Sequence, residues 1–154
     1  MSAITLIVVD VDGTLCESRP VEGGFAAWEE SVIEDHPEPH PTALREIPLL
    51  LARHPTARRV ILTARHGRLR TVTRDFLTAH YWQTLGRLPL MMSCLAEGSY
   101  GGADDAAARM ASRAHKLERL SNLRRMCPGY MLLVDDDAYM SAACGPRDTF
   151  VRAW

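Results

Sequence analysis

An apolar segment at residues 4–9, in which Thr5 is the one polar residue, ends directly in the turn sequence Asp-Val-Asp-Gly-Thr at residues 10–14. A short apolar run that is bounded by turn residues is typical of a fully buried strand. In α/β proteins, binding and catalytic residues gather where such strands end, at the carboxyl edge of the sheet. The sequence therefore predicts that Asp10 and Asp12 lie together at the functional edge of a parallel sheet.

Three further polar positions extend this pattern. A second apolar segment ends in Thr63, a third ends in the acidic run at residues 135–137, and Lys116 lies in the helical segment before that run. Lys116 is the only lysine among the 18 lysine and arginine side chains, so the composition otherwise avoids lysine. Its solitude and its place favour a functional role over the alternative, a solvated helix residue.

These residue types suit the transfer of a phosphoryl group. Asp10 is the candidate nucleophile, because a carboxylate can attack phosphorus and form an aspartyl-phosphate. Asp12 is the candidate general acid and then general base, since residues i and i+2 of a strand share a face. Thr63 and Lys116 are expected to donate to the phosphoryl oxygens, which carry charge in the transition state. Thr63 could instead cap a helix that starts near Gly67.

A divalent cation is expected beside these carboxylates. A phosphate ester and a carboxylate nucleophile repel each other, and Mg²⁺, which prefers oxygen ligands, would neutralise both. The expected ligands are Asp10, the backbone carbonyl of Asp12, and Asp135 or Asp136. One aspartate of the run 135–137 is surplus to this site and is expected to cap a following helix.

The four segments resemble the four ordered motifs of the haloacid dehalogenase superfamily of phosphohydrolases. The resemblance rests on residues 10–15, Thr63, Lys116 and residues 135–136. It covers nearly the whole chain and implies a Mg²⁺-dependent phosphatase or phosphotransferase, because the dehalogenase branch lacks the second aspartate of the first motif. In this superfamily, lids are inserted after the first motif or after the third strand, here residues 18–41 and 93–105. Insertions of about 20 residues can form a hairpin or one helix but no separate cap domain, so the resemblance implies an open site.

A narrower resemblance concerns the substrate. Residues 62–65, the strand near 89–92 and the tryptophan-ended last strand are similar to the 3′-phosphatase module of bacteriophage polynucleotide kinases. It implies that the phosphorylated end is bound by Arg65, beside Thr63 and Ala64, and by Arg19, although Arg19 lies closer to the aspartates than the pattern has it. Arg68 is a further candidate, because it belongs to a short basic stretch that could follow a nucleic-acid backbone. For Arg68, Arg70 and Arg74 a solvated helix face is the alternative to a nucleic-acid contact. The kinase domain that usually accompanies this module is missing, so a separate kinase or ligase is a possible partner.

Strand-like and helix-like segments alternate along the chain. The expected strands lie near residues 4–10, 59–63, 89–93, 130–135 and 149–153. The expected helices lie near residues 42–53, 67–81 and 103–126, the second with an apolar stripe formed by Leu69, Val72, Thr73, Phe76, Leu77 and His80. Pro48 should kink the first helix or shift its start. The alternation predicts one domain over residues 1–154, with a doubly wound (Rossmann-like) α/β fold, a parallel sheet of about five strands and no large cap.

Composition bears on the binding partners, the state of the cysteines and the location of the protein. A net charge of −1 gives no overall attraction to nucleic acid or membranes. The cysteines form no Cys-x-x-Cys pair, which favours reduced thiols and no zinc site. No targeting leader and no apolar run long enough to span a membrane are seen, so a cytoplasmic location is expected.

The sequence thus predicts a Mg²⁺-dependent phosphatase that acts on 3′-phosphates of nucleic-acid ends, as in nucleic acid repair. Two alternatives stay open. One is a nucleotidase that acts on free nucleoside or deoxynucleoside monophosphates. The other is a non-catalytic phosphate-binding or regulatory module, although such a module has no physical need to keep Asp12 beside Asp10.

Overall fold

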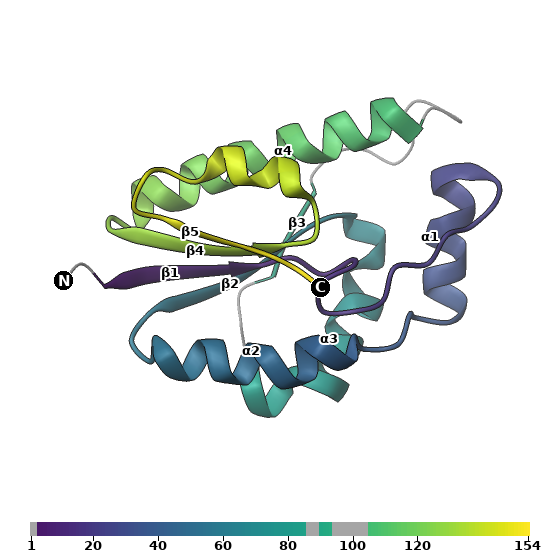
Figure 1. Cartoon of the computed structure of the whole chain (residues 1–154). Helices are drawn as coiled ribbons and strands as arrows, with labels where there is room; N and C mark the ends of the chain where they lie inside the picture. Colours follow the sequence, from purple (N-terminus) through teal and green to yellow (C-terminus); the bar gives the residue numbers. More distant parts are fainter. Residues whose placement is uncertain (1–2, 86–89, 94–104) are drawn as a thin grey trace.

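Five parallel strands form the central sheet of the computed structural model within the residues that it describes, 3–85, 90–93 and 105–154 (Figure 1). The strands are β1 (Ile4–Val9), β2 (Arg58–His66), β3 (Leu90–Ser93), β4 (Tyr130–Asp135) and β5 (Thr149–Arg152). Their order across the sheet is β3-β2-β1-β4-β5, and each neighbouring pair is parallel. The predicted doubly wound α/β fold is confirmed.

The strand order explains why the ends of β1 and β4 form a functional edge. From β1 the chain builds outward through β2 to β3, and it then returns to the other side of β1 and continues through β4 to β5. The direction of winding therefore reverses between β1 and β4. At such a switch point the loops that follow the two strands separate and leave a crevice outside the carboxyl edge.

Helices cover both faces of the sheet (Figure 1). They include α2 (Pro41–Arg53) and α3 (Arg70–Leu85) on one face, and α4 (Asp105–Met126) with the short 3-10 helix η2 (Ala138–Ala143) on the other. Ile7 and Val9 of β1 belong to the buried cluster that includes residues of α2 and α3, whereas Leu6 and Val8 belong to the cluster that includes residues of α4. A strand that is buried on both faces has no polar side, which explains why the buried residues 6–9 are all apolar.

The segment predicted as a helix over 67–81 begins as the 3-10 helix η1 (Gly67–Leu69) and continues as α3. The buried members of its predicted stripe are Leu69, Thr73 and Phe76. The stripe was wrong at His80, which is exposed. Tyr81 is buried instead of His80. Its buried hydroxyl is satisfied by a hydrogen bond that it donates to the backbone carbonyl of Leu15, in the loop after β1.

The segment after β1 forms a single helix, α1 (Gly24–Glu34), which stands at the carboxyl end of the sheet (Figure 1). This agrees with an insertion too short for a separate cap. The described part of the second insertion is limited to Ser93 and the start of α4, so the rest of residues 93–105 lies outside the described residues. Pro48 lies inside α2 and does not shift its start, which is at Pro41. Among the described residues, no helix is long and apolar enough to cross a membrane.

Gly129 leads into β4 and offers a test of the fold that is separate from the site. Its φ of +124° is a conformation that L side chains rarely adopt, and a Cβ atom there would lie 2.3 Å from Thr5 Oγ1. We therefore expect Gly129→Ala to lower the free energy of unfolding by about 1–3 kcal/mol. Denaturant unfolding measures this change. Gly67→Ala is the control, since nothing lies within 4 Å of a Cβ at Gly67, and an equal loss in both variants would contradict the prediction.

Candidate active site

The loop after β1 places Asp10 at the switch point. The backbone N–H of Asp10 donates to the carbonyl of Val134 at 3.0 Å, so the sheet holds this residue one position beyond β1. The loop then turns sharply, with the amides of residues 14–16 all donating to the carbonyl of Val11. At the turn, Gly13 has a φ of +72°, and a Cβ atom there would lie 2.2 Å from Asp136 Oδ2. Only glycine allows the loop to pass this close to Asp136.

Lys116 joins the two buried carboxylates at this edge. Its Nζ donates to Asp10 Oδ1 and to Asp135 Oδ2, both at 2.8 Å, and all three side chains are buried. Burial disfavours the ammonium, but the two carboxylates outweigh it and raise the pKa of Lys116 above its usual value. Lys116 is therefore a fixed positive charge beside Asp10, and the surface-residue alternative is wrong.

Three carboxylates converge into a group that could hold a metal ion. Oxygen atoms of Asp10, Asp135 and Asp136 all lie within 4.8 Å of one another. Burial and the neighbouring Asp135 raise the pKa of Asp10 well above its usual value, against the opposing effect of Lys116. Three carboxylates near the single ammonium of Lys116 give the site an excess of negative charge, which favours a cation. All the ligand atoms are oxygens, which are the ligands that Mg²⁺ prefers. The donor set therefore fits the expected cation.

The third aspartate of the acidic run has a structural role. The Asp137 carboxylate caps η2 by accepting from the Tyr139 N–H at 3.1 Å. It also accepts from Nε and Nη2 of Arg113, at 2.7 and 3.0 Å, and this contact holds the pKa of Asp137 below its usual value. The prediction that one residue of the run caps a helix is confirmed for Asp137.

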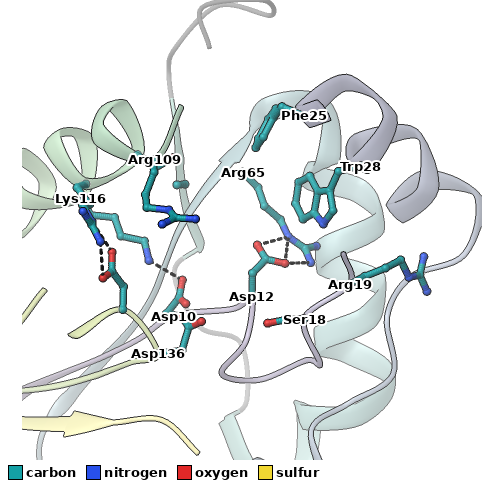
Figure 2. Close-up of a pocket in the computed structure, with 14 residues that line it drawn as sticks. Asp10, Asp12, Ser18, Arg19, Phe25, Trp28, Arg65, Arg109, Lys116 and Asp136 are labelled. Carbon is teal, nitrogen blue, oxygen red and sulfur yellow. Dashed lines mark hydrogen bonds and ion pairs between the residues drawn. The ribbon is translucent and has the colours of Figure 1, made fainter. Parts of the chain in front are cut away.

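The Asp12 carboxylate lies apart from the acidic group and pairs with Arg65 (Figure 2). Arg65 Nη2 lies 2.7 Å from Asp12 Oδ1, and Arg65 Nε lies 3.0 Å from Asp12 Oδ2. The contact is bidentate, with the Arg65 side chain fully buried. A metal ligand from Asp12 would therefore be its backbone carbonyl, as the sequence suggested, because its carboxylate is held elsewhere.

Thr63 shapes the end of β2. The strand continues to His66, beyond the predicted end, so Thr63 lies inside it and is buried. Its Oγ1 accepts from the backbone N–H of Arg65 at 3.2 Å. The residue that precedes η1 is His66, so the alternative of Thr63 as a helix cap is wrong. Ala64 is half-buried and lines the adjacent cavity.

A cavity of about 280 Å³ opens above the aspartates (Figure 2). The residues that line it are Asp10, Asp12, Ser18, Arg19, Phe25, Trp28, Ala64, Arg65, Arg109, Ser112, Arg113, Lys116, Asp136 and Asp137. One wall is aromatic and comes from α1, and another is basic and comes from α4. Sequence reasoning missed both walls. The signal was present in the basic wall, since Arg109, Ser112, Arg113 and Lys116 follow the i, i+3, i+4, i+7 spacing of one helix face.

Two arginines that the resemblance assigned to the substrate are engaged by α1. Arg19 lines the cavity, but its guanidinium donates to the carbonyls of Ser31 (3.1 Å) and Asp35. Arg68 is not among the lining residues, and it pairs with Glu29 at 3.3 Å and with Glu30. Both arginines therefore fix α1 over the edge of the sheet in this structure.

The fold has relatives among solved structures. No family model and no curated protein matches the sequence. The chain is similar to a chain of the Pnkp1/Rnl/Hen1 complex, with a TM-score of 0.61 and 16% identity over 98% of this chain and 46% of that one. It is also similar to the HAD domain of the effector protein Lem4 from Legionella pneumophila, with a TM-score of 0.55 and 13% identity over 99% of this chain and 87% of that one.

The fold is that of a HAD domain. An inactive mutant of the same Lem4 domain gives a TM-score of 0.54 at 12% identity, over 97% of this chain and 85% of that one. At these identities the likeness establishes the fold, and the resemblance to the haloacid dehalogenase superfamily is confirmed at that level. The chain spans less than half the length of the Pnkp1/Rnl/Hen1 chain that it matches.

Proposed function

We propose that this protein is a Mg²⁺-dependent phosphomonoesterase that forms an aspartyl-phosphate at Asp10 and removes 3′-phosphates from nucleic-acid ends. The observation that carries the proposal is the buried Lys116 ammonium, 2.8 Å from Asp10 and 2.8 Å from Asp135 at the switch point of a HAD-like sheet. A fixed positive charge beside a carboxylate nucleophile is useful where an anionic substrate gains charge during the reaction.

The first half-reaction uses Asp10 and Asp12. A carboxylate oxygen of Asp10 forms a bond to phosphorus, and the bond from phosphorus to the leaving oxygen breaks. Asp12 enters this step as the carboxylic acid, and its proton passes to the leaving oxygen. Asp10 is oriented in advance, because Lys116 donates to Oδ1 at 2.8 Å and the Thr14 hydroxyl donates to Oδ2 at 3.3 Å.

The second half-reaction restores the enzyme. Asp12, now a carboxylate, takes a proton from water, whose oxygen forms a bond to the phosphorus of the aspartyl-phosphate. The bond from phosphorus to the Asp10 oxygen breaks, which restores the Asp10 carboxylate and releases inorganic phosphate. Arg65 keeps the Asp12 carboxylate at the wall of the cavity and out of the acidic group. Mg²⁺ held by Asp10, Asp135, Asp136 and the Asp12 carbonyl would neutralise charge on the phosphoryl oxygens.

The lining of the cavity supports a nucleic-acid substrate. Phe25 and Trp28 offer aromatic rings on which a base can stack, and Arg109 and Arg113 line the same cavity from α4. The segment over the cavity is a single helix, α1. A substrate that is longer than the cavity can therefore extend out of it into solvent. The resemblance to the polynucleotide kinase 3′-phosphatase module supports the same substrate class.

A substrate panel tests the proposal. With Mg²⁺ present, kcat/KM for a 3′-phosphorylated oligonucleotide should exceed that for the matching 3′-mononucleotide, and the advantage should shrink with added salt as phosphate contacts are screened. Matching 5′-phosphorylated oligonucleotides and 5′-mononucleotides complete the panel, and released phosphate is measured. A 5′-phosphorylated substrate that reacts faster than its 3′ counterpart would contradict the assignment.

The second candidate is a nucleotidase that acts on free nucleoside monophosphates. The observation in its favour is the size of the cavity, about 280 Å³, which lies just below the range of about 300–1,000 Å³ that is typical of small-molecule sites. In that case the mononucleotide is the better substrate at every salt concentration. The same panel therefore separates the two candidates.

A further inference from the structure

The cavity contains five cationic side chains, and they differ in how many of their donors are already used. The five are Arg19, Arg65, Arg109, Arg113 and Lys116. An anionic substrate can be held only by N–H groups that remain available to it. An inventory of the donors therefore shows which side chain can recognise the substrate.

Arg65 has no donor left. Its Nε and one Nη2 hydrogen are used by Asp12, and Nη2 also lies 3.6 Å from Cys16 Sγ. Its Nη1 donates to Thr73 Oγ1 at 2.9 Å and to His36 Nε2 at 2.8 Å. His36 can accept this bond because its Nδ1 faces the carbonyl of Pro37 at 2.8 Å, and burial, with the nearby Arg65, lowers the pKa of His36 to about 4. The five N–H groups of the guanidinium thus meet five acceptors. In this arrangement Arg65 positions Asp12.

Three other cations are also engaged. Arg113 forms two hydrogen bonds to Asp137 and lies over the ring of Tyr139, with 4.5 Å from Cζ to the ring centroid. Arg19 donates to backbone carbonyls at the end of α1. Lys116 uses two of its three hydrogens on Asp10 and Asp135, which leaves one for the transferred phosphoryl group.

Arg109 differs from all of these. It is exposed, it extends from α4 into the cavity (Figure 2), and within the described ranges it forms no ion pair or hydrogen bond. Arg109 lies two helical turns before Lys116, which corresponds to about 10 Å along the helix axis. If Lys116 contacts the transferred phosphoryl group, a side chain attached this far along the same helix can reach the part of the substrate that leaves.

The wall contributed by α1 completes the description of the leaving group. Phe25 and Trp28, one helical turn apart, are half-buried at the cavity, and their ring centroids lie 5.2 Å apart. Aromatic side chains of this kind stack with nucleobases. The cavity thus offers an acidic floor for the reacting phosphate and an aromatic wall for a base. Arg113 and Arg19 keep some N–H groups, but aspartates pair with both, so within the described residues Arg109 is the cavity guanidinium whose charge and donors are not already used.

We propose that Arg109 binds a second phosphate on the leaving group, so that the preferred substrates carry a base and a further phosphate beside the one that is removed. The inference rests on the proposed function and extends it. A nucleoside 3′,5′-bisphosphate is the smallest molecule of this class, and a 3′-phosphorylated strand presents the same two phosphates. Recognition of a single additional phosphate, rather than of chain length, then sets the substrate preference.

The test compares a nucleoside 3′,5′-bisphosphate with the matching 3′-monophosphate. For the native protein, kcat/KM should be about tenfold or more in favour of the bisphosphate, as for one charge-assisted hydrogen bond. Arg109→Ala should bring the ratio close to one, and Arg109→Lys should keep part of it. Arg125→Ala is the control, because Arg125 is an exposed arginine at the far end of α4. A ratio of one in the native protein, or a ratio that survives Arg109→Ala, would overturn the proposal.

Two further measurements separate this proposal from the proposed function. Turnover of p-nitrophenyl phosphate with Mg²⁺ reports phosphatase activity without a second phosphate, so its absence counts against the proposed function alone. Binding of the bisphosphate to Asp10→Asn protein reports recognition without turnover. In that background Arg109→Ala should weaken Kd for the bisphosphate by about tenfold, and an unchanged Kd would exclude Arg109 as its ligand.

Discussion

Asp10→Asn is expected to reduce kcat by more than about a hundredfold, a barrier increase above about 2.7 kcal/mol. An amide cannot attack phosphorus, and it removes one negative charge from the group formed by Asp10, Asp135 and Asp136. The fold should be retained, because the asparagine oxygen can still accept from Lys116. Phosphate release measures the effect, and thermal unfolding checks the structure.

A trapped complex gives independent support for this role. Beryllium fluoride or aluminium fluoride should lodge on the Asp10 carboxylate in a crystal of the native protein, as an analogue of the phosphorylated aspartate. Asp75→Asn, at an exposed position on α3, is the control and should keep native activity. An Asp10→Asn protein that retains more than about a hundredth of native kcat would show that another group is the nucleophile.

Lys116→Met is expected to lower kcat by about a hundredfold to a thousandfold, as the loss of other single electrostatic donors does. The variant leaves Asp10 and Asp135 buried side by side without the cation that separates them, so the carboxylates repel each other and take up a proton more readily. Lys116→Arg should fail nearly as badly, because a planar fork does not fit where a compact ammonium bridges two oxygens.

The control for Lys116 lies on the same helix. Arg125→Met removes a positive charge from an exposed part of α4 and should leave kcat within about twofold of the native value. The readout is kcat measured with p-nitrophenyl phosphate together with the free energy of unfolding, which shows whether catalysis falls more than stability. Near-native activity in both Lys116 variants would mean that the ammonium does not act on the phosphoryl group.

The sequence by itself determined the fold class of this protein and the residues of the candidate active site. A parallel strand that is buried on both faces is mostly apolar, so the segment before Asp10 indicated both its own strand and the edge where it ends. The same reasoning placed the acidic run at the same edge of the sheet, after another strand. Lys116 could be recognised because the composition otherwise avoids lysine. Each of these signals is a local sequence pattern, and the strand order brings the residues that carry them together at one edge of the sheet.

Only the tertiary structure decided how the remaining charges are used. Arg65 was expected to grip the substrate, but its partners Asp12, His36 and Thr73 come from three separate segments and use its donors first. In the sequence nothing distinguishes Arg109 from the other arginines of the cavity, but within the described residues those three pair with aspartates and Arg109 does not. A charged side chain can bind a ligand only with donors that no protein acceptor within about 3 Å already uses. Which acceptors lie that close depends on the fold, because spacing along the chain does not give the distance between two groups in space.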